Sequence, residues 1–137
     1  MKRRAFLGYL FATGLLGGTS WGSVDSADRA TLDRIVGRAM AGYNSGNTQQ
    51  FYANWAALVK PMENPEAFRR QYLDIYIRAY GSYRSRQLVE RESEISTTNA
   101  ILVYHAQFSK KPGNLTVSFV KEGSAYRIQQ IRVGRYP

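Results

Sequence analysis

The stretch FRRQYLDIYIRAYGSYRSRQLVERESE, residues 68–94, contains the sharpest change of pattern in the chain. Before Gly81, apolar residues recur at the spacing of one helix face, and after it the pattern becomes the alternation typical of strands. A glycine at this position suits a helix end, because glycine adopts the left-handed backbone conformation at little cost. The stretch therefore predicts a helix that ends at Gly81 and a sheet that begins directly after it.

Two more amphipathic helices are predicted before this stretch. The first ends at the pair Ser45-Gly46. Its buried stripe is Leu32, Ile35, Val36, Ala39, Met40 and Tyr43. The second begins at Asn47, which is expected to form a capping box with Gln50, and Pro61 ends it. Its buried stripe is Phe51, Tyr52, Trp55, Leu58 and Val59.

The third helix has the clearest start. Asn64, Pro65 and Glu66 supply a cap, a proline suited to the first turn and an acid near the positive end of the helix. Its predicted core stripe is Phe68, Tyr72, Ile75, Tyr76 and Ala79. Three helices are thus expected before the sheet.

Four strands are predicted after Gly81, at residues 83–94, 99–109, 115–121 and 125–133. The first is polar and charged, which suits the edge of a sheet. In the second, alternate residues from Ala100 to Phe108 face the core, whereas the residues between them face away: Ile101, Val103, His105 and Gln107. Short turns make the strands an antiparallel meander. Helices followed by antiparallel strands predict an α+β fold with N-terminal helices packed on one face of the sheet.

Residues 1–22, MKRRAFLGYLFATGLLGGTSWG, have the three-part layout of an export signal. The apolar run from Ala5 to Leu16 is about half the roughly 20 residues needed to span a bilayer, so export is favoured over a membrane anchor. The motif positions of the signal are Arg3, Arg4, Phe6 and Leu7. They resemble the twin-arginine export motif, although Lys2 and Gly8 depart from it and the ordinary secretion route stays open.

The predicted organisation is a signal peptide in residues 1–22 and one α+β domain in residues 23–137, located in the periplasm or outside a bacterial cell. Loss of Lys2, Arg3 and Arg4 with the signal lowers the net charge of +9 by three, so the exported domain remains basic. Its basic residues are scattered, which favours a solvated surface. No nucleic-acid partner is expected.

Composition excludes several chemistries. The chain has no cysteine, so disulfides, thiolate zinc sites, iron–sulfur clusters and cysteine nucleophiles are ruled out. His105 is the only histidine, which excludes sites that need two imidazoles. No cofactor and no metal site is predicted.

Three passages resemble the nuclear-transport-factor-two-like, or cystatin-like, superfamily. Residues 43–47, YNSGN, are similar to the turn between its first helix and its aromatic second helix. Residues 80–89 resemble the helix-to-strand passage of small exported members without an assigned activity, and residues 122–128 resemble its closing hairpin. The resemblance covers about residues 28–134. It implies a curved, cone-shaped sheet around the helices, enclosing a cavity that members use for catalysis, ligand binding or oligomer contacts.

Aromatic residues on the predicted helices and the second strand indicate what such a cavity would bind. Tyrosine and tryptophan combine a large apolar ring with a polar tip, as pocket linings often do. The candidate ligand-binding residues are Tyr52, Trp55, Tyr72, Tyr76 and Tyr104. The main hypothesis is a non-catalytic exported domain that binds a small apolar or amphipathic ligand, or an envelope protein. The simpler alternative is that these rings fill the core, with their hydroxyls at its rim.

Two other functions stay open on the sequence. A cavity enzyme of the isomerase or hydrolase kind would use Tyr104, His105 and Asp74, and requires at least two of them to converge. A basic surface module would attach weakly to anionic envelope components. Its residues would be Arg84, Arg86, Arg127 and Arg132. A second copy of the chain is a further candidate partner.

Overall fold

The structure, a computed structural model, describes residues 23–57, 59 and 65–136, apart from the side chains of residues 23–27, 65–69, 71 and 72. The predicted export signal, with Arg3, Arg4, Phe6 and Leu7, lies outside the described residues. Among the described helices, none combines the length and the apolarity needed to cross a membrane.

The chain divides into two compact units, residues 1–34 and residues 35–137. Helix α1 (Ser23–Ser45) belongs to both, with the boundary between Arg34 and Ile35. The second unit holds the sheet and the other helices. The predicted domain boundary after residue 22 stays a prediction.

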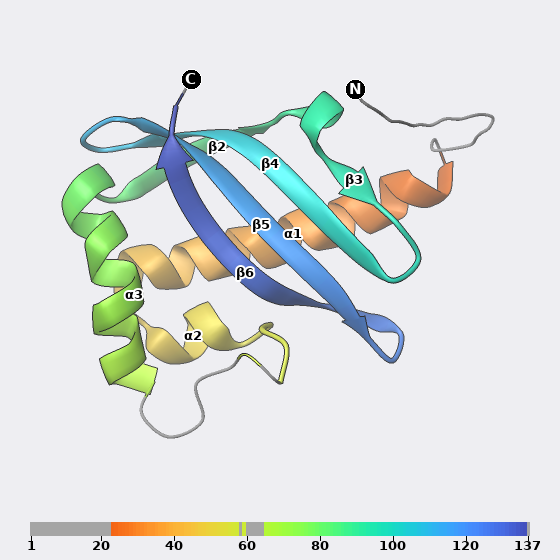
Figure 1. The fold of residues 1–137 in the computed structure, drawn as a ribbon, viewed down its shortest axis with the longest axis horizontal. Helices are drawn as coiled ribbons and strands as arrows, with labels where there is room; N and C mark the ends of the chain where they lie inside the picture. The colour runs from red at the N-terminus through yellow and green to blue at the C-terminus, as the bar shows by residue number, and fades with distance from the viewer. Residues whose placement is uncertain (1–22, 58, 60–64, 137) are drawn as a thin grey trace. The chain divides into compact units, whose positions relative to one another are not determined.

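In the second unit, helices precede an antiparallel sheet, so the predicted α+β fold is confirmed (Figure 1). The end of α1 is followed by α2 (Thr48–Tyr52) and α3 (Pro65–Tyr80). The five-stranded sheet has the order β2 (Tyr83–Leu88), β4 (Asn99–Phe108), β5 (Pro112–Glu122) and β6 (Ala125–Arg135), and β3 (Glu94–Ile95) also pairs with β4. The single strand predicted for residues 83–94 is instead β2, a short 3-10 helix η2 (Glu90–Glu92) and β3.

One face of the curved sheet carries the core. The predicted core face of β4 is confirmed, because its residues are all buried: Ala100, Leu102, Tyr104, Ala106 and Phe108. Val103, predicted to face away, is buried as well. Their neighbours on β5 and β6 are buried too: Leu115, Val117, Phe119, Ile128, Ile131 and Val133. The register between β5 and β6 shifts between Ser118 and Phe119, and such an irregularity bends and twists a strand pair.

The junction between α1 and α2 depends on Gly42. A Cβ atom at this position would lie 2.6 Å from the Phe51 backbone nitrogen, so only glycine permits this approach. Asn47 caps α2 as predicted, since its side-chain oxygen accepts a hydrogen bond from Gln50 N at 3.0 Å. The return bond of the capping box is not formed: Asn47 N donates to Ser45 Oγ, and the Gln50 side chain donates to a backbone carbonyl of α1.

Helix α2 ends at Tyr52, earlier than the predicted end at Pro61. After it, the backbone pairs with the edge of β6. Ala56 N donates to Ile128 O and Ile128 N donates to Asn54 O, both at 2.7 Å. The prediction fails because the spacing of apolar residues does not reveal a strand edge elsewhere in the chain. Here the backbone N–H and C=O groups after Tyr52 bond to the edge of β6 in place of a further helical turn.

The predicted core stripe of α3 is wrong at Ile75 and Ala79, Tyr76 is half-buried, and the side chains of Phe68 and Tyr72 lie outside the described residues. Leu73 and Tyr80 are buried, whereas Ile75 is 57% exposed and Ala79 is exposed. Apolar residues occur around much of this helix, so their spacing does not select one face. Packing selects it, because the Tyr80 ring lies over Gly113 of β5, where a Cβ atom would come within 3.0 Å of Tyr80 Cε1.

Candidate functional site

Three aromatic residues on and directly after α2 pack together on the helix side of the sheet. We call Phe51, Tyr52 and Trp55 the α2 cluster. Their ring centroids lie 4.8 Å apart for Phe51 and Tyr52, 5.5 Å for Phe51 and Trp55, and 5.1 Å for Tyr52 and Trp55. Each side chain is buried. Tilted and edge-to-face contacts of this kind add about 0.5–1.5 kcal/mol per pair beyond the apolar area buried.

The segment after the α2 cluster is tied to the turn between β5 and β6. Glu122 Oε2 accepts a hydrogen bond from Ala57 N at 2.9 Å, and its Oε1 lies 3.9 Å from Arg127 Nε. Trp55 forms a parallel bridge with Ile128 on β6. The α2 cluster is therefore positioned by a strand edge and a turn rather than by a long helix.

A second group of rings surrounds Phe108 at the end of β4. We call Tyr43, Tyr80, Tyr83 and Phe108 the Phe108 cluster. The centroid of the Phe108 ring lies 6.1 Å from that of Tyr43, 5.5 Å from that of Tyr80 and 5.9 Å from that of Tyr83. These rings come from α1, α3, β2 and β4, so the cluster joins both layers of the second unit.

Hydrogen bonds to the backbone fix this second cluster. The Tyr43 hydroxyl donates to Gly81 O at 2.8 Å, and burial raises the pKa of Tyr43 to about 12. The Asn44 side chain pairs with both backbone groups of Tyr83: Asn44 Nδ2 donates to Tyr83 O at 2.8 Å, and Tyr83 N donates to Asn44 Oδ1 at 2.7 Å. Asn44 thus acts like one residue of a neighbouring strand beside the edge of β2.

Arg86 lies on the helix side of the sheet, next to both Tyr83 and Tyr104. Its Nη1 donates to the Tyr83 hydroxyl at 2.7 Å, and its guanidinium carbon lies 5.4 Å from the centre of the Tyr104 ring. The side chain is half-buried, and Nη2 comes within 3.3 Å of the position that a Cβ on Gly37 would take. The structure thus places Arg86 inside the unit, away from the surface expected for an attachment residue.

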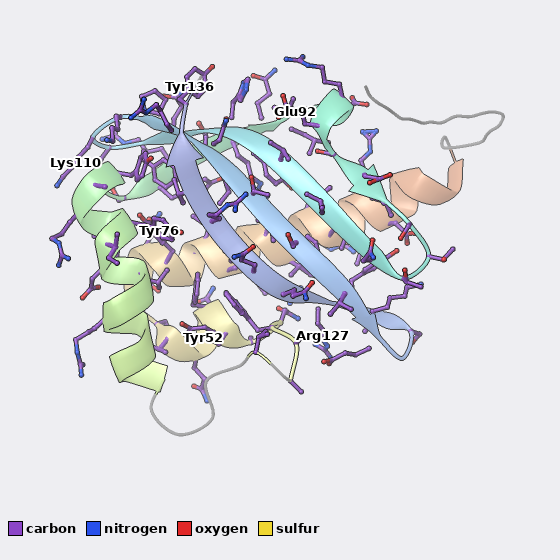
Figure 2. The ribbon with its side chains drawn as sticks, in the orientation of Figure 1. Tyr52, Tyr76, Glu92, Lys110, Arg127 and Tyr136 are labelled. Carbon is purple, nitrogen blue, oxygen red and sulfur yellow. The ribbon has the colours of Figure 1, made fainter. Side chains whose placement is uncertain are left out.

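The predicted ligand-binding residues are only partly brought together. Figure 2 labels two of them, Tyr52 at the end of α2 and Tyr76 on α3. Tyr52 and Trp55 contact each other, and Tyr76 lies half-buried on α3. Tyr104 is fully buried, but strand spacing and rise put its backbone about 16 Å from that of Ile128, beside which Trp55 lies. The side chain of Tyr72 lies outside the described residues.

The three acid–base candidates do not converge on one face of the sheet. Tyr104 faces the core, and His105 faces the opposite side, where it pairs with Asn114 and its ring centroid lies 4.8 Å from that of Tyr136. Asp74 is half-buried on α3, the helix that packs on the core face. The contact between His105 and Tyr136 had no sequence signal, because it depends on the register of β4, β5 and β6. Within the described ranges, no group of three His, Asp or Glu residues could hold a metal ion.

The arginines proposed as an attachment surface do not form one patch. Arg84 and Arg86 are on β2, and Arg127 and Arg132 are on β6, which is the opposite edge of the sheet. Arg127 also forms an ion pair with Glu122 at the far end of the strands. The strand order that separates these residues cannot be read from their spacing in the sequence.

No protein-family model and no curated protein matches this chain. Solved structures do match it. An NTF-2-like protein of unknown function from Shewanella oneidensis is 14% identical, with a TM-score of 0.53, over 78% of this chain and 98% of that one. A DUF4783 family protein from Bacteroides uniformis is 11% identical, with a TM-score of 0.50, over 73% of this chain and 95% of that one.

A third similar structure is Bd1075 of Bdellovibrio bacteriovorus, at 14% identity and a TM-score of 0.53. The match covers 85% of this chain but only 43% of Bd1075, so the chain spans less than half of that protein. At these identities the likeness concerns the fold alone. Together with the helices and the curved sheet, it defines an NTF-2-like fold, as the sequence resemblance implied.

Proposed function

We propose that this chain is an exported, non-catalytic NTF-2-like domain that binds a small apolar or amphipathic molecule at the α2 cluster. The observation that carries the proposal is the mutual contact of Phe51, Tyr52 and Trp55 on the helix side of the sheet. Such rings bind a ligand by burying its apolar area, and a phenol or indole end can orient a polar group.

The way in which the α2 cluster is held favours it over the Phe108 cluster as the binding site. Residues 54–57 leave the helix and are held by backbone pairing to the edge of β6 and by Glu122. A small movement of this segment would expose the rings without unwinding a long helix, and such locally weak segments are common at ligand sites. In the Phe108 cluster, the rings come from four elements that side chains of α1 tie to the backbone at Gly81 and Tyr83, so opening it would separate several elements.

The positions of the acid–base candidates favour binding over catalysis. General acid–base catalysis needs its groups within hydrogen-bond reach of one substrate. Tyr104 and His105 are on opposite faces of β4, so one small substrate between the layers would meet only Tyr104.

Export is the part of the proposal that rests on residues 1–22. In the native host, we expect the protein in the envelope or medium fraction and shortened at its N-terminus, as N-terminal sequencing would show. The double change Arg3→Lys and Arg4→Lys keeps the positive charge but removes the arginine pair, so it should stop export by the twin-arginine route. Unchanged export of this variant would assign the chain to the ordinary secretion route.

The binding proposal is tested first by native mass spectrometry of protein recovered gently from the host envelope. We expect an added mass that organic extraction removes and that is identified as an apolar or amphipathic compound. Fluorescence of the Trp21→Phe variant then reports on Trp55 alone, because these are the two tryptophans of the chain. The extracted compound should shift this emission when it is added back.

Matched variants locate the site. Tyr52→Phe should weaken binding of an amphipathic compound, whereas Tyr83→Phe in the Phe108 cluster should not, since it changes the same group elsewhere. Protein that carries no added mass, together with Trp55 emission that extracts leave unchanged, would contradict the proposal. Equal weakening by both variants would place the ligand away from the α2 cluster.

A further inference from the structure

Charge is segregated along the strand direction of the sheet. Between Ile75 and Tyr136 the sequence has only four carboxylate side chains: Glu90, Glu92, Glu94 and Glu122. Glu122 lies where β5 ends and Glu94 pairs with Ile101 near the start of β4, whereas Glu90 and Glu92 follow β2, whose last residue, Leu88, pairs with Tyr104 in the middle of β4. We call the part of the sheet from the middle of β4 to the end of β5 the glutamate end.

The opposite end of the sheet carries five exposed cations and is called the cation end: Arg78, Arg84, Lys110, Lys111 and Arg135. They come from the last turn of α3, the start of β2, the turn between β4 and β5, and the end of β6. None of the four glutamates lies in the last turn of α3, at the start of β2, in the β4–β5 turn or at the end of β6. Asp74, one turn before Arg78 on α3, is half-buried.

Backbone contacts hold the segments of the cation end side by side. Lys110 N donates to Tyr80 O at 2.9 Å, and Ser109 N donates to Ser82 O at 2.8 Å, which joins the β4–β5 turn to the end of α3. Arg135 pairs with Gly113 at the start of β5. Figure 2 shows Lys110 and Tyr136 at this end of the strands and Arg127 at the other. The five cations are therefore near one another although they are spread over 58 positions of sequence, from Arg78 to Arg135.

The glutamates do not neutralise these cations. Glu122 is separated from the start of β5 by ten residue steps, about 33 Å, and Leu88, which precedes Glu90 and Glu92, is level with Tyr104, about 13 Å along β4 from Phe108, whereas charges are screened over about 8 Å at physiological ionic strength. The cations at the glutamate end have local partners instead: Arg91 lies 3.9 Å from Glu92, and Arg127 lies 3.9 Å from Glu122. The cation end therefore attracts anions with little opposition from the rest of the sheet.

We infer that the cation end docks on the anionic headgroups of a lipid membrane. The flanking aromatic residue favours lipid over other polyanions, because Tyr136, next to Arg135, is 38% exposed and its amphipathic ring suits a membrane–water interface. Lysine and arginine bind headgroup phosphates through charge-assisted hydrogen bonds. Nucleic acids are read by elements that enter a groove or by several stacking rings, and this end presents one exposed ring among the described aromatics. The inference does not depend on a ligand at the α2 cluster.

The test compares two triple variants that remove the same net charge. The first changes the cation end: Arg84→Gln, Lys111→Gln and Arg135→Gln. The control changes the glutamate end: Arg91→Gln, Lys121→Gln and Arg127→Gln. The lysines are closely matched, since Lys111 Nζ lies 4.8 Å from the Tyr80 ring centre and Lys121 Nζ lies 5.0 Å from that of Tyr126. Circular dichroism and melting temperature establish that both variants fold.

Binding is measured by co-sedimentation with phosphatidylglycerol vesicles and with phosphatidylcholine vesicles, over a series of salt concentrations. The quantity compared is the part of the vesicle binding that salt weakens. Apolar residues such as 5–16 could also insert into the vesicles, but salt does not screen that contribution in this way. Each cation near an anionic surface contributes about fivefold to binding, so the cation-end triple should lose about 100-fold. The control triple should lose less than about threefold, since its charges lie more than one screening length away.

Several outcomes would overturn the inference. Equal losses by the two triples would show attraction by net charge alone, and equal binding to both lipids would show that headgroup charge is irrelevant. Competition by inorganic phosphate beyond that of chloride at equal ionic strength would indicate a site for free phosphate. Tighter salt-sensitive binding to polyglutamate or to duplex DNA than to phosphatidylglycerol would replace the membrane with an acidic protein or a nucleic acid.

Discussion

The two aromatic clusters pack on the same face of the sheet but are held by different kinds of contact. In the Phe108 cluster, side chains bind the backbone of distant elements: Tyr43 binds Gly81 O, and Asn44 binds both backbone groups of Tyr83. In the α2 cluster, the rings follow a five-residue helix whose continuation is paired with the edge of β6. The first cluster is therefore a joint between layers, and the second is held at the edge of a strand.

The largest expected effect is on stability at the Phe108 cluster. Phe108→Ala should lower the free energy of unfolding by about 3–5 kcal/mol, because rings from three other elements surround the cavity it leaves. Phe51→Ala should lower it by less, since the segment after α2 can move into the space. Urea unfolding measures both. A greater loss of unfolding free energy for Phe51→Ala than for Phe108→Ala would show that the α2 cluster, and not the Phe108 cluster, contributes more to stability.

The next effect concerns the side-chain pairing of Asn44. Asn44→Ala removes two hydrogen bonds to Tyr83 and should lower the free energy of unfolding by about 1–3 kcal/mol. Asn54→Ala is the control, because the Asn54 side chain accepts one longer bond, from Arg38 Nη1 at 3.3 Å. Thermal melts should rank Asn44→Ala clearly below the control, and equal melting temperatures would show that Asn44 does not stabilise the joint.

Tyr43 makes the stability of the first cluster depend on pH. Its pKa is about 12 in the folded chain and 10.0 ordinarily, so the folded state holds the proton more tightly. The resulting stabilisation is complete below pH 10 and is lost as the pH rises from 10 to 12. The fall in melting temperature between pH 9 and pH 11.5 should be steeper for the native chain than for Tyr43→Phe.

Tyr43→Phe should also lower the free energy of unfolding at pH 7 by about 1 kcal/mol, since the bond to Gly81 O is lost. Parallel slopes for the native chain and Tyr43→Phe would mean that another group causes the alkaline loss.

The smallest effect is expected at the anchor of the α2 cluster. Glu122→Ala removes the acceptor of Ala57 N and should lower the free energy of unfolding by about 0.5–1.5 kcal/mol. Glu122→Gln keeps an acceptor and removes only the exposed ion pair with Arg127, so it should change stability by less than about 0.5 kcal/mol. Hydrogen exchange of residues 54–57 should quicken in the alanine variant alone, and quickening in both would assign the anchoring to the charge.

Local patterns in the sequence predicted the order of elements and much of the core. The inward residues of β4, the Asn47 cap and the end of α3 before Gly81 follow from alternation, capping chemistry and glycine geometry, which act over a few neighbouring residues. The early end of α2 and the buried face of α3 did not follow, because each depends on a partner far away in sequence, Ile128 and Gly113.

The features of the candidate site likewise divide into those that local sequence predicted and those that depend on distant residues. Tyr52 and Trp55 are three residues apart and were predicted on one helix face; they are close, although a turn, with a hydrogen bond from Trp55 N to Tyr52 O, replaces the helix between them. Their distance from Tyr104, the placement of His105 beside Tyr136, and the separation of Arg86 from Arg132 all follow from strand order and register.

From the order of its residues alone, the chain specified an α+β fold of helices followed by an antiparallel meander, because periodicity, caps and turn glycines are properties of short segments. Only the folded chain settled which rings meet, which face of α3 is buried and where the cations gather. Those features depend on contacts between residues dozens of positions apart, and the free energy of such contacts exists only once both layers are packed.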